Sequence, residues 1–163
     1  FPDFSTLPFD GDVGAFPPPT GEVWATPEGI EDYEIVFDQR EALNSNILVG
    51  NLLSRETTPI EVHDGVMPLK YEYFAVDAIV FPYLKSKGVT LRSRKHGRTL
   101  RVTFAGNDNL MFWTKPGAPY ICIEPWTNAP DFLDCDGDIT HKPGAIRLAP
   151  GQRDIREHVI TVE

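Results

Sequence analysis

The sequence predicts an all-β protein with an antiparallel sandwich or barrel architecture. Short segments with apolar side chains at alternate positions recur along the chain, and glycine, proline and asparagine separate them. The 163 residues include 15 prolines and 13 glycines, a composition that favours turns and short strands over long helices. No segment keeps the helical period for more than about two turns, so an antiparallel β fold is expected.

The first half of the chain is expected to contain three strands. Prolines in residues 1–30 exclude a long helix, and the aromatic side chains there indicate a strand fragment and loops lying against the core. Residues 31–38 alternate as a half-buried strand does, and residues 46–53 predict a second strand broken at Gly50-Asn51. Residues 71–81 predict an aromatic turn followed by a buried strand.

The second half contains the clearest hairpin of the sequence. Residues 88–93 and 99–104 alternate well and are joined by a turn at His96-Gly97. A polar turn is expected at residues 107–109. The later strands are expected at 110–114, 120–124, 144–148 and 155–162.

Size and charge restrict the class of protein. We expect residues 1–163 to form a single domain, because a chain of this length can bury one core. A formal net charge of −9 argues against nucleic acid or an anionic membrane as partner, since both bind clustered positive charge. No apolar run approaches the length that spans a bilayer. The two cysteines, Cys122 and Cys135, do not resemble a disulfide framework, which favours a cytoplasmic setting.

Glu124 is the first candidate site residue, because it lies in an apolar run directly before Pro-Trp. If residues 120–124 form a strand, Glu124 shares a face with Tyr120 and Cys122 while the two isoleucines take the other. A carboxylate beside aromatic rings suits a sugar, whose hydroxyls donate to the acid and whose C–H face packs on a ring. The alternative is an edge strand whose glutamate faces water.

Asp77 has a similar setting, after aromatic residues and before a buried strand. The two acids would then line one sugar pocket. Alternatively, the Asp77 side chain caps its own turn through a hydrogen bond to the backbone.

No metal site is expected. Four aspartates lie close together, but their spacing fails the calcium-loop pattern, and no two of the four histidines have metal-ligand spacing with a third ligand. A solvated acidic turn is the simpler interpretation. The aspartates are Asp131, Asp134, Asp136 and Asp138.

Several blocks of the sequence resemble one known family. Residues 113–126 (WTKPGAPYICIEPW) are similar to the signature of the aldose 1-epimerase (galactose mutarotase) family. Further matching blocks occur along the chain in the same order as in the family. They are 31–37 (EDYEIVF), 74–81 (FAVDAIVF), Asp131, 137–140 (GDIT) and 143–151 (PGAIRLAPG). The resemblance implies a galactose mutarotase-like β-sandwich, of which this chain is the C-terminal portion with the N-terminal strands absent.

The resemblance also implies a function in carbohydrate metabolism. Members of this family are isomerases that exchange the α and β anomers of an aldose such as galactose or glucose by acid–base catalysis, without a cofactor. Glu124 matches the general base, and Asp77 matches the acid that hydrogen-bonds sugar hydroxyls. Trp113 and Trp126 are candidates for pocket walls that stack on the substrate, or else core residues.

The chain departs from the family pattern in two places. Val13 stands where the family has its acid histidine, and valine cannot transfer a proton. The family domain also begins well before this chain does, so exposed sheet edges, self-association or a partner segment that completes the sandwich are expected. A non-catalytic carbohydrate-binding remnant and a purely structural fragment therefore remain as alternatives to the enzyme.

Overall fold

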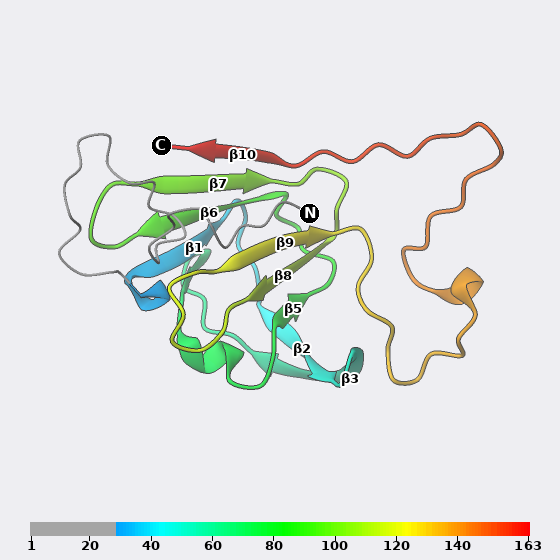
Figure 1. Ribbon diagram of the computed structural model, residues 1–163, viewed down its shortest axis with the longest axis horizontal. Helices are drawn as coiled ribbons and strands as arrows, with labels where there is room; N and C mark the ends of the chain where they lie inside the picture. The colour runs from blue at the N-terminus through cyan, green and yellow to red at the C-terminus, as the bar shows by residue number, and fades with distance from the viewer. Residues whose placement is uncertain (1–28) are drawn as a thin grey trace, which may run out of the picture.

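The computed structural model describes residues 29–163, which form two five-stranded antiparallel sheets (Figure 1). The first sheet has the order β10-β7-β6-β1-β4 and the second β3-β2-β5-β8-β9. The predicted all-β antiparallel fold is confirmed. Val13 and the other predictions for residues 1–28 lie outside the described residues. The strands are β1 (Tyr33–Phe37), β2 (Asn44–Val49), β3 (Leu52–Pro59), β4 (Val66–Pro68), β5 (Ile79–Phe81), β6 (Gly88–Ser93), β7 (Thr99–Thr103), β8 (Asn109–Trp113), β9 (Cys122–Trp126) and β10 (Val159–Val162).

Helical structure in residues 29–163 is limited to three short 3-10 turns, η2 (Ile30–Asp32), η3 (Tyr71–Phe74) and η4 (Ile139–His141). The aromatic turn predicted before β5 corresponds to η3. No helix within the described residues is long and apolar enough to cross a membrane.

The first sheet forms as its alternation predicts. In β1 the side chains of Tyr33, Ile35 and Phe37 are buried, and the residues between them are half-buried. The hairpin of β6 and β7 pairs antiparallel over five residue pairs, and β6 also pairs with β1. The strand and the hairpin predicted for this sheet are therefore confirmed.

The second sheet differs from the prediction at two strands. Residues 46–53 are a hairpin and not one strand, because Gly50 has a φ of 62° and the chain reverses between β2 and β3. The strand predicted at 120–124 begins two residues later, as β9, where it pairs antiparallel with β8.

The core lies between the two sheets. Phe112 of β8 is fully buried and contacts Phe37 of the first sheet and Phe81 of the second in edge-to-face geometry, with ring centroids 6.4 and 6.2 Å away. Burying a side chain of this size stabilises the fold by roughly 1.5–3 kcal/mol. The buried core residues come from strands of both sheets, and this packed layer supports what lies on the outer face of the second sheet.

The C-terminal region leaves the sandwich and returns to its edge (Figure 1). The strand predicted at 144–148 is wrong, and only Val159–Val162 of the segment 155–162 is a strand. Gly144 and Gly151 have φ values of 77° and 82°, so the chain turns at each end of the segment between them instead of extending beside a partner. Strand β10 then pairs with β7.

Strand β10 carries an apolar face that is not covered by the described residues. Ile35, Leu91, Leu100 and Val162 lie opposite one another across β1, β6, β7 and β10 and share the core-facing side of the sheet. Ile35 is fully buried and Leu91 is 5% exposed, whereas Val162 is 51% exposed. The core-facing side of the first sheet therefore extends beyond the second sheet.

Candidate functional site

Glu124 lies on the outer face of the second sheet, opposite to the core. Its neighbour Ile123 packs against the core, and successive side chains of a strand point to opposite faces. Backbone pairing places Glu124 opposite Met111, Met111 opposite Val80, and Val80 opposite Asn46. These four side chains form one row across β9, β8, β5 and β2, so the strands beneath hold Glu124 in place.

A hollow of about 350 Å³ opens on this face and brings the predicted site residues together. Glu124 and Trp126 come from β9, Trp113 from the end of β8, and Asp77 from the loop before β5. The other lining residues are Leu48, Gly50, Asn51, Ala78, Met111 and Pro130. The two acids and two indoles that the sequence singles out therefore line one hollow.

The half-buried Glu124 carboxylate is held by its neighbour two positions along β9. The indole Nε1–H of Trp126 donates a hydrogen bond to Glu124 Oε2 over 3.3 Å. Cys122 lies on the same face, as the alternation predicts; burial raises the pKa of its thiol, and the charge of Glu124 adds to the effect. The thiol therefore stays protonated near neutral pH.

Asp77 lines the hollow and also caps its own turn. Its Oδ1 accepts a hydrogen bond of 2.7 Å from the backbone N–H of Ala78, as the turn-capping alternative predicts. A carboxylate has about four acceptor positions on its two oxygens, so this bond leaves Asp77 able to accept from a ligand. The two interpretations of Asp77 are therefore compatible, and the cap fixes its position at the start of β5.

The two tryptophans form part of the outer face and not of the core. Trp113 is 36% exposed and packs against Tyr120 with ring centroids 5.9 Å apart. Trp126 is half-buried in the hollow. The loop between them is fixed at its base by fully buried Thr114, whose Oγ1 donates to the Tyr120 carbonyl over 2.6 Å. Both indoles are thus available to a ligand on this face.

Two buried asparagines that the sequence assigns to a polar turn hold the end of β9. Asn109 Nδ2 donates to the carbonyls of Trp126 and Thr127, over 3.3 and 3.0 Å. Asn107 Oδ1 accepts from Thr127 Oγ1 over 2.9 Å. Composition marks these residues only as turn formers, because their partners lie about 20 positions further along the chain.

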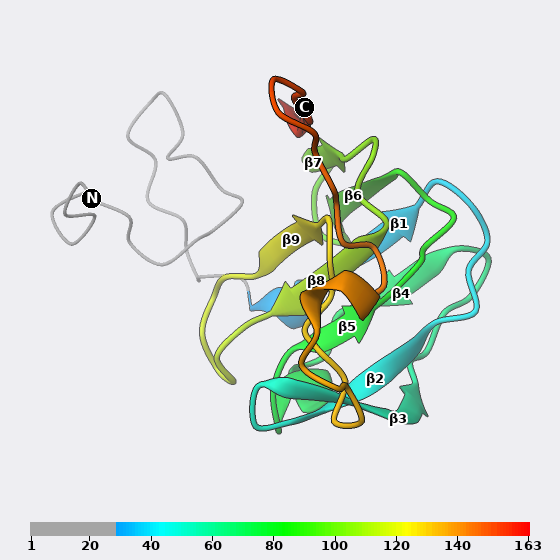
Figure 2. The same cartoon turned by 90° about the vertical axis from the view of Figure 1, so that its right-hand side faces the viewer.

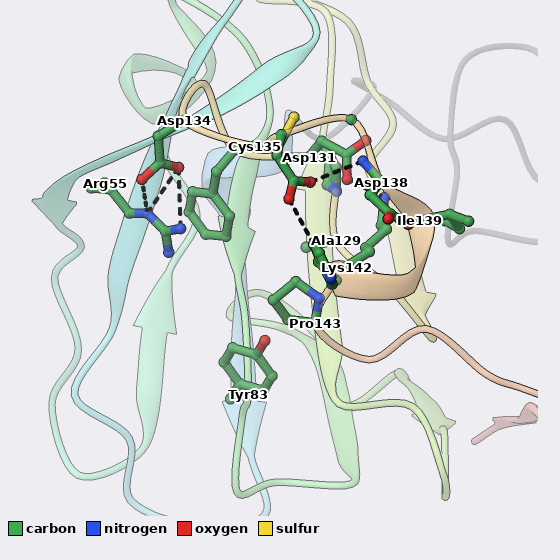
Figure 3. Close-up of a pocket in the computed structure, with 15 residues that line it drawn as sticks. Arg55, Tyr83, Ala129, Asp131, Asp134, Cys135, Asp138, Ile139, Lys142 and Pro143 are labelled. Carbon is green, nitrogen blue, oxygen red and sulfur yellow. Dashed lines mark hydrogen bonds and ion pairs between the residues drawn. The ribbon is translucent and has the colours of Figure 1, made fainter.

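The segment after β9, residues 127–134, crosses the outer face of the second sheet and reaches β3 (Figure 2). It is called the crossing segment below. Leu53 of β3 donates its backbone N–H to the Asp131 carbonyl, and the Leu53 carbonyl accepts from Leu133. This crossing segment forms one wall of the Glu124 hollow at Pro130. The same proline also lines a second hollow of about 300 Å³. Figure 3 shows this second hollow.

The acidic residues of the segment line the second hollow as ion pairs. Asp134 accepts from Arg55 of β3, and Asp131 pairs with Lys142 over 2.8 Å. The hydrogen bond from Arg55 holds the pKa of Asp134 below its usual range. Within residues 29–163 no group of three or more histidine, cysteine, aspartate or glutamate side chains is arranged to hold a metal ion. Arg55 carries no sequence signal for this role, because Asp134 lies 79 residues away.

Comparison with known sequences finds relatives of about twice the length. The chromosomal and plasmid forms of protein LacX from Lactococcus lactis are each 34% identical over 139 residues. The match covers 83% of this chain and 46% of each relative, so the chain spans about half the length of the curated relatives it matches. No protein-family model matches the chain.

Comparison with solved structures defines the class of fold. A galactose mutarotase-related enzyme from Lactobacillus acidophilus superposes with a TM-score of 0.68 at 24% identity, over 86% of this chain and 48% of that one. A galactose mutarotase-like protein from Lactobacillus casei gives 0.65 at 19% identity, over 82% and 46%. The chain therefore has a galactose mutarotase-like fold, as the resemblance implies.

Proposed function

We propose that this chain is the C-terminal portion of an aldose 1-epimerase-type isomerase domain, which interconverts the α and β anomers of aldoses such as galactose and glucose. The observation that carries the proposal is the hollow of about 350 Å³ that Asp77, Glu124, Trp113 and Trp126 line together. A concave site with a few polar groups among apolar and aromatic walls is the usual form of a small-molecule pocket. This arrangement matches an aldose, which has both hydroxyls and an apolar C–H face.

In the proposed reaction Glu124 acts as the general base. Its carboxylate removes the proton of the anomeric hydroxyl while an acid protonates the ring oxygen, and the C1–O5 bond breaks to give the open-chain aldehyde. Rotation about the C1–C2 bond followed by ring closure gives the other anomer and returns both protons. Asp77 accepts hydrogen bonds from sugar hydroxyls, and the Trp126 N–H orients Glu124 from Oε2. Trp113 covers the C–H face of the ring.

The acid in this scheme is supplied by a polypeptide segment that completes the sandwich. Val13 stands at the family position of the acid and has no proton to give. The chain spans about half of its curated relatives, and β10 leaves Ile160 and Val162 65% and 51% exposed on the core-facing side of the sheet. Both observations support a partner segment, or a second copy of the chain, against this face.

A non-catalytic carbohydrate-binding remnant is the second candidate, and valine at position 13 is the observation that favours it. In that case the hollow keeps its affinity for an aldose but does not deliver a proton to the ring oxygen. Binding would then saturate, while anomer exchange would proceed at its spontaneous rate.

A cytoplasmic location is also part of the proposal. Cys122 and Cys135 are both free thiols, which fits a reducing compartment. Localisation of the tagged protein by cell fractionation tests this point separately from the chemistry.

Anomer exchange of freshly dissolved α-galactose and α-glucose tests the proposed function, with NMR or polarimetry as the readout. We expect the chain to accelerate exchange once the segment that supplies the acid, or a second copy of the chain, is packed against it. In that assembly Glu124→Gln should abolish the acceleration, and the control Glu56→Gln should retain it, because Glu56 is exposed on β3 and does not line the hollow. Saturable sugar binding without acceleration would support the binding remnant instead. Absence of both binding and acceleration would overturn the proposal.

A further inference from the structure

The second hollow lies directly beside the first. Pro130 lines both, so the space around Glu124 and the space around Arg55 and Tyr83 adjoin at this residue. With volumes of about 300 and 350 Å³, the two hollows are similar in size. A ligand made of two linked units of similar size could therefore place one unit on each side of Pro130.

One end of the second hollow carries an exposed aromatic ring. Tyr83 is 62% exposed and lies beneath Pro143, at the end away from the Arg55–Asp134 pair (Figure 3). A second ring, Phe132, is covered by the Arg55 guanidinium at 3.8 Å from the ring centroid. Arg55 therefore covers the face of the Phe132 ring, whereas the exposed ring of Tyr83 can pack on the apolar side of a ligand.

In the second hollow, hydrogen-bond donors and hydrogen-bond acceptors lie side by side. The Arg55–Asp134 and Lys142–Asp131 pairs each present N–H groups next to carboxylate oxygens, and His141 pairs with Asp136 over 2.6 Å. A hydroxyl group both donates and accepts a hydrogen bond, so it suits such a pair better than a group that can do only one of these.

The charge of the hollow selects against other classes of ligand. Four aspartates outnumber Arg55, Lys142 and His141, even when the histidine is protonated, so a phosphate or another anion is repelled. A metal ion is not favoured either, because Asp134 and Asp131 are paired with Arg55 and Lys142. The other two carboxylates are also engaged, Asp136 with His141 and Asp138 with the Thr140 N–H. A neutral ligand rich in hydroxyls remains.

We propose that the second hollow binds a second neutral sugar unit, so that the preferred ligand is a reducing disaccharide or a longer oligosaccharide. The inference rests on the proposed function, since the reducing-end unit occupies the Glu124 hollow. The second unit lies across Pro130, stacks on Tyr83 and exchanges hydrogen bonds with the Arg55–Asp134 and Lys142–Asp131 pairs.

Titration of the 163-residue chain with glucose, galactose, maltose, cellobiose and lactose tests the inference, by calorimetry or NMR. We expect at least one disaccharide to bind about tenfold more tightly than its monosaccharide, a difference of about 1.4 kcal/mol. Tyr83→Asn, which removes the ring, should bring disaccharide affinity down to the monosaccharide level. Tyr83→Phe keeps the ring and should keep most of the preference.

Asparagine is the chosen replacement because Tyr83 has a φ of 59°, a left-handed conformation that asparagine tolerates. Equal affinity for monosaccharides and disaccharides, or a preference that survives Tyr83→Asn, would overturn the inference. If monosaccharides still bind and undergo exchange that depends on Glu124, the proposed function stands without it. If no sugar binds, both fail together.

Discussion

The Glu124 hollow and the terminal strand β10 differ in what lies behind them. The strands that carry Glu124, Met111 and Val80 are backed by a layer of buried side chains between the two sheets. Strand β10 has the same alternation of side chains, but all four of its residues are exposed. Sequence alternation alone therefore does not make a strand part of the core, because a second layer must also cover it.

The difference has a consequence for function. Side chains on well-packed strands keep their geometry, which a base and its hydroxyl ligands need. An uncovered edge with apolar side chains is suited to docking another segment of polypeptide. Within residues 29–163 the two properties are found in separate places, with the proposed chemistry on the second sheet and the open edge on the first.

The largest expected effect comes from breaking the core on which the hollow rests. Phe112→Ala removes the ring that joins the two sheets and should lower the free energy of unfolding by about 3–5 kcal/mol. Val162→Ala, on the uncovered strand, should change it by less than about 0.5 kcal/mol. Urea denaturation followed by circular dichroism measures both. Similar losses in the two variants would show that β10 is packed as tightly as the centre of the sandwich.

A smaller effect is expected at the junction between β9 and the crossing segment. Asn109→Ala leaves the Trp126 and Thr127 carbonyls without their shared donor and should cost roughly 1–3 kcal/mol of stability. If Asn109 also positions Trp126, sugar affinity should fall in this variant after correction for the unfolded fraction. Asn44→Ala, at the exposed start of β2, is the matched control. Unchanged affinity in folded Asn109→Ala would restrict Asn109 to a role in stability.

The sequence predicts the strands whose partners lie nearby. Tyr33, Ile35 and Phe37 alternate, and the β6–β7 hairpin closes over a short turn, so local pattern and final structure agree. The face of Glu124 follows from alternation for the same reason. Residues 144–148 also look like a strand, but whether a strand forms depends on a partner far along the chain, which a local pattern does not contain.

Local sequence patterns also predict only part of the candidate site. Glu124 and Asp77 stand out because each is a carboxylate beside apolar and aromatic residues. Arg55 and Asn109 do not, since each acts on a group brought close only by the fold. Acids in apolar settings can therefore be found from sequence, whereas residues such as Arg55 and Asn109 can be found only once the pairing of distant segments is known.

The smallest effect is expected at the ion pair that joins the crossing segment to β3. Arg55 donates to both carboxylate oxygens of Asp134 and lowers the pKa of that group in the folded chain. A carboxyl group whose pKa is lowered in the folded chain stabilises the fold at pH values above its unfolded-state pKa of about 3.9. This stabilisation is lost as the pH falls through the folded-state pKa. Arg55→Gln should raise the Asp134 pKa towards about 3.9.

Carboxyl NMR titration of Asp134 measures this shift, and Arg153→Gln, at an exposed arginine of the C-terminal region, serves as the control. The pair is exposed to solvent, so added salt should weaken the shift in the unmodified chain. A pKa of Asp134 that does not respond to Arg55→Gln would mean that the backbone contacts of Leu53, and not this ion pair, hold the crossing segment against the second sheet.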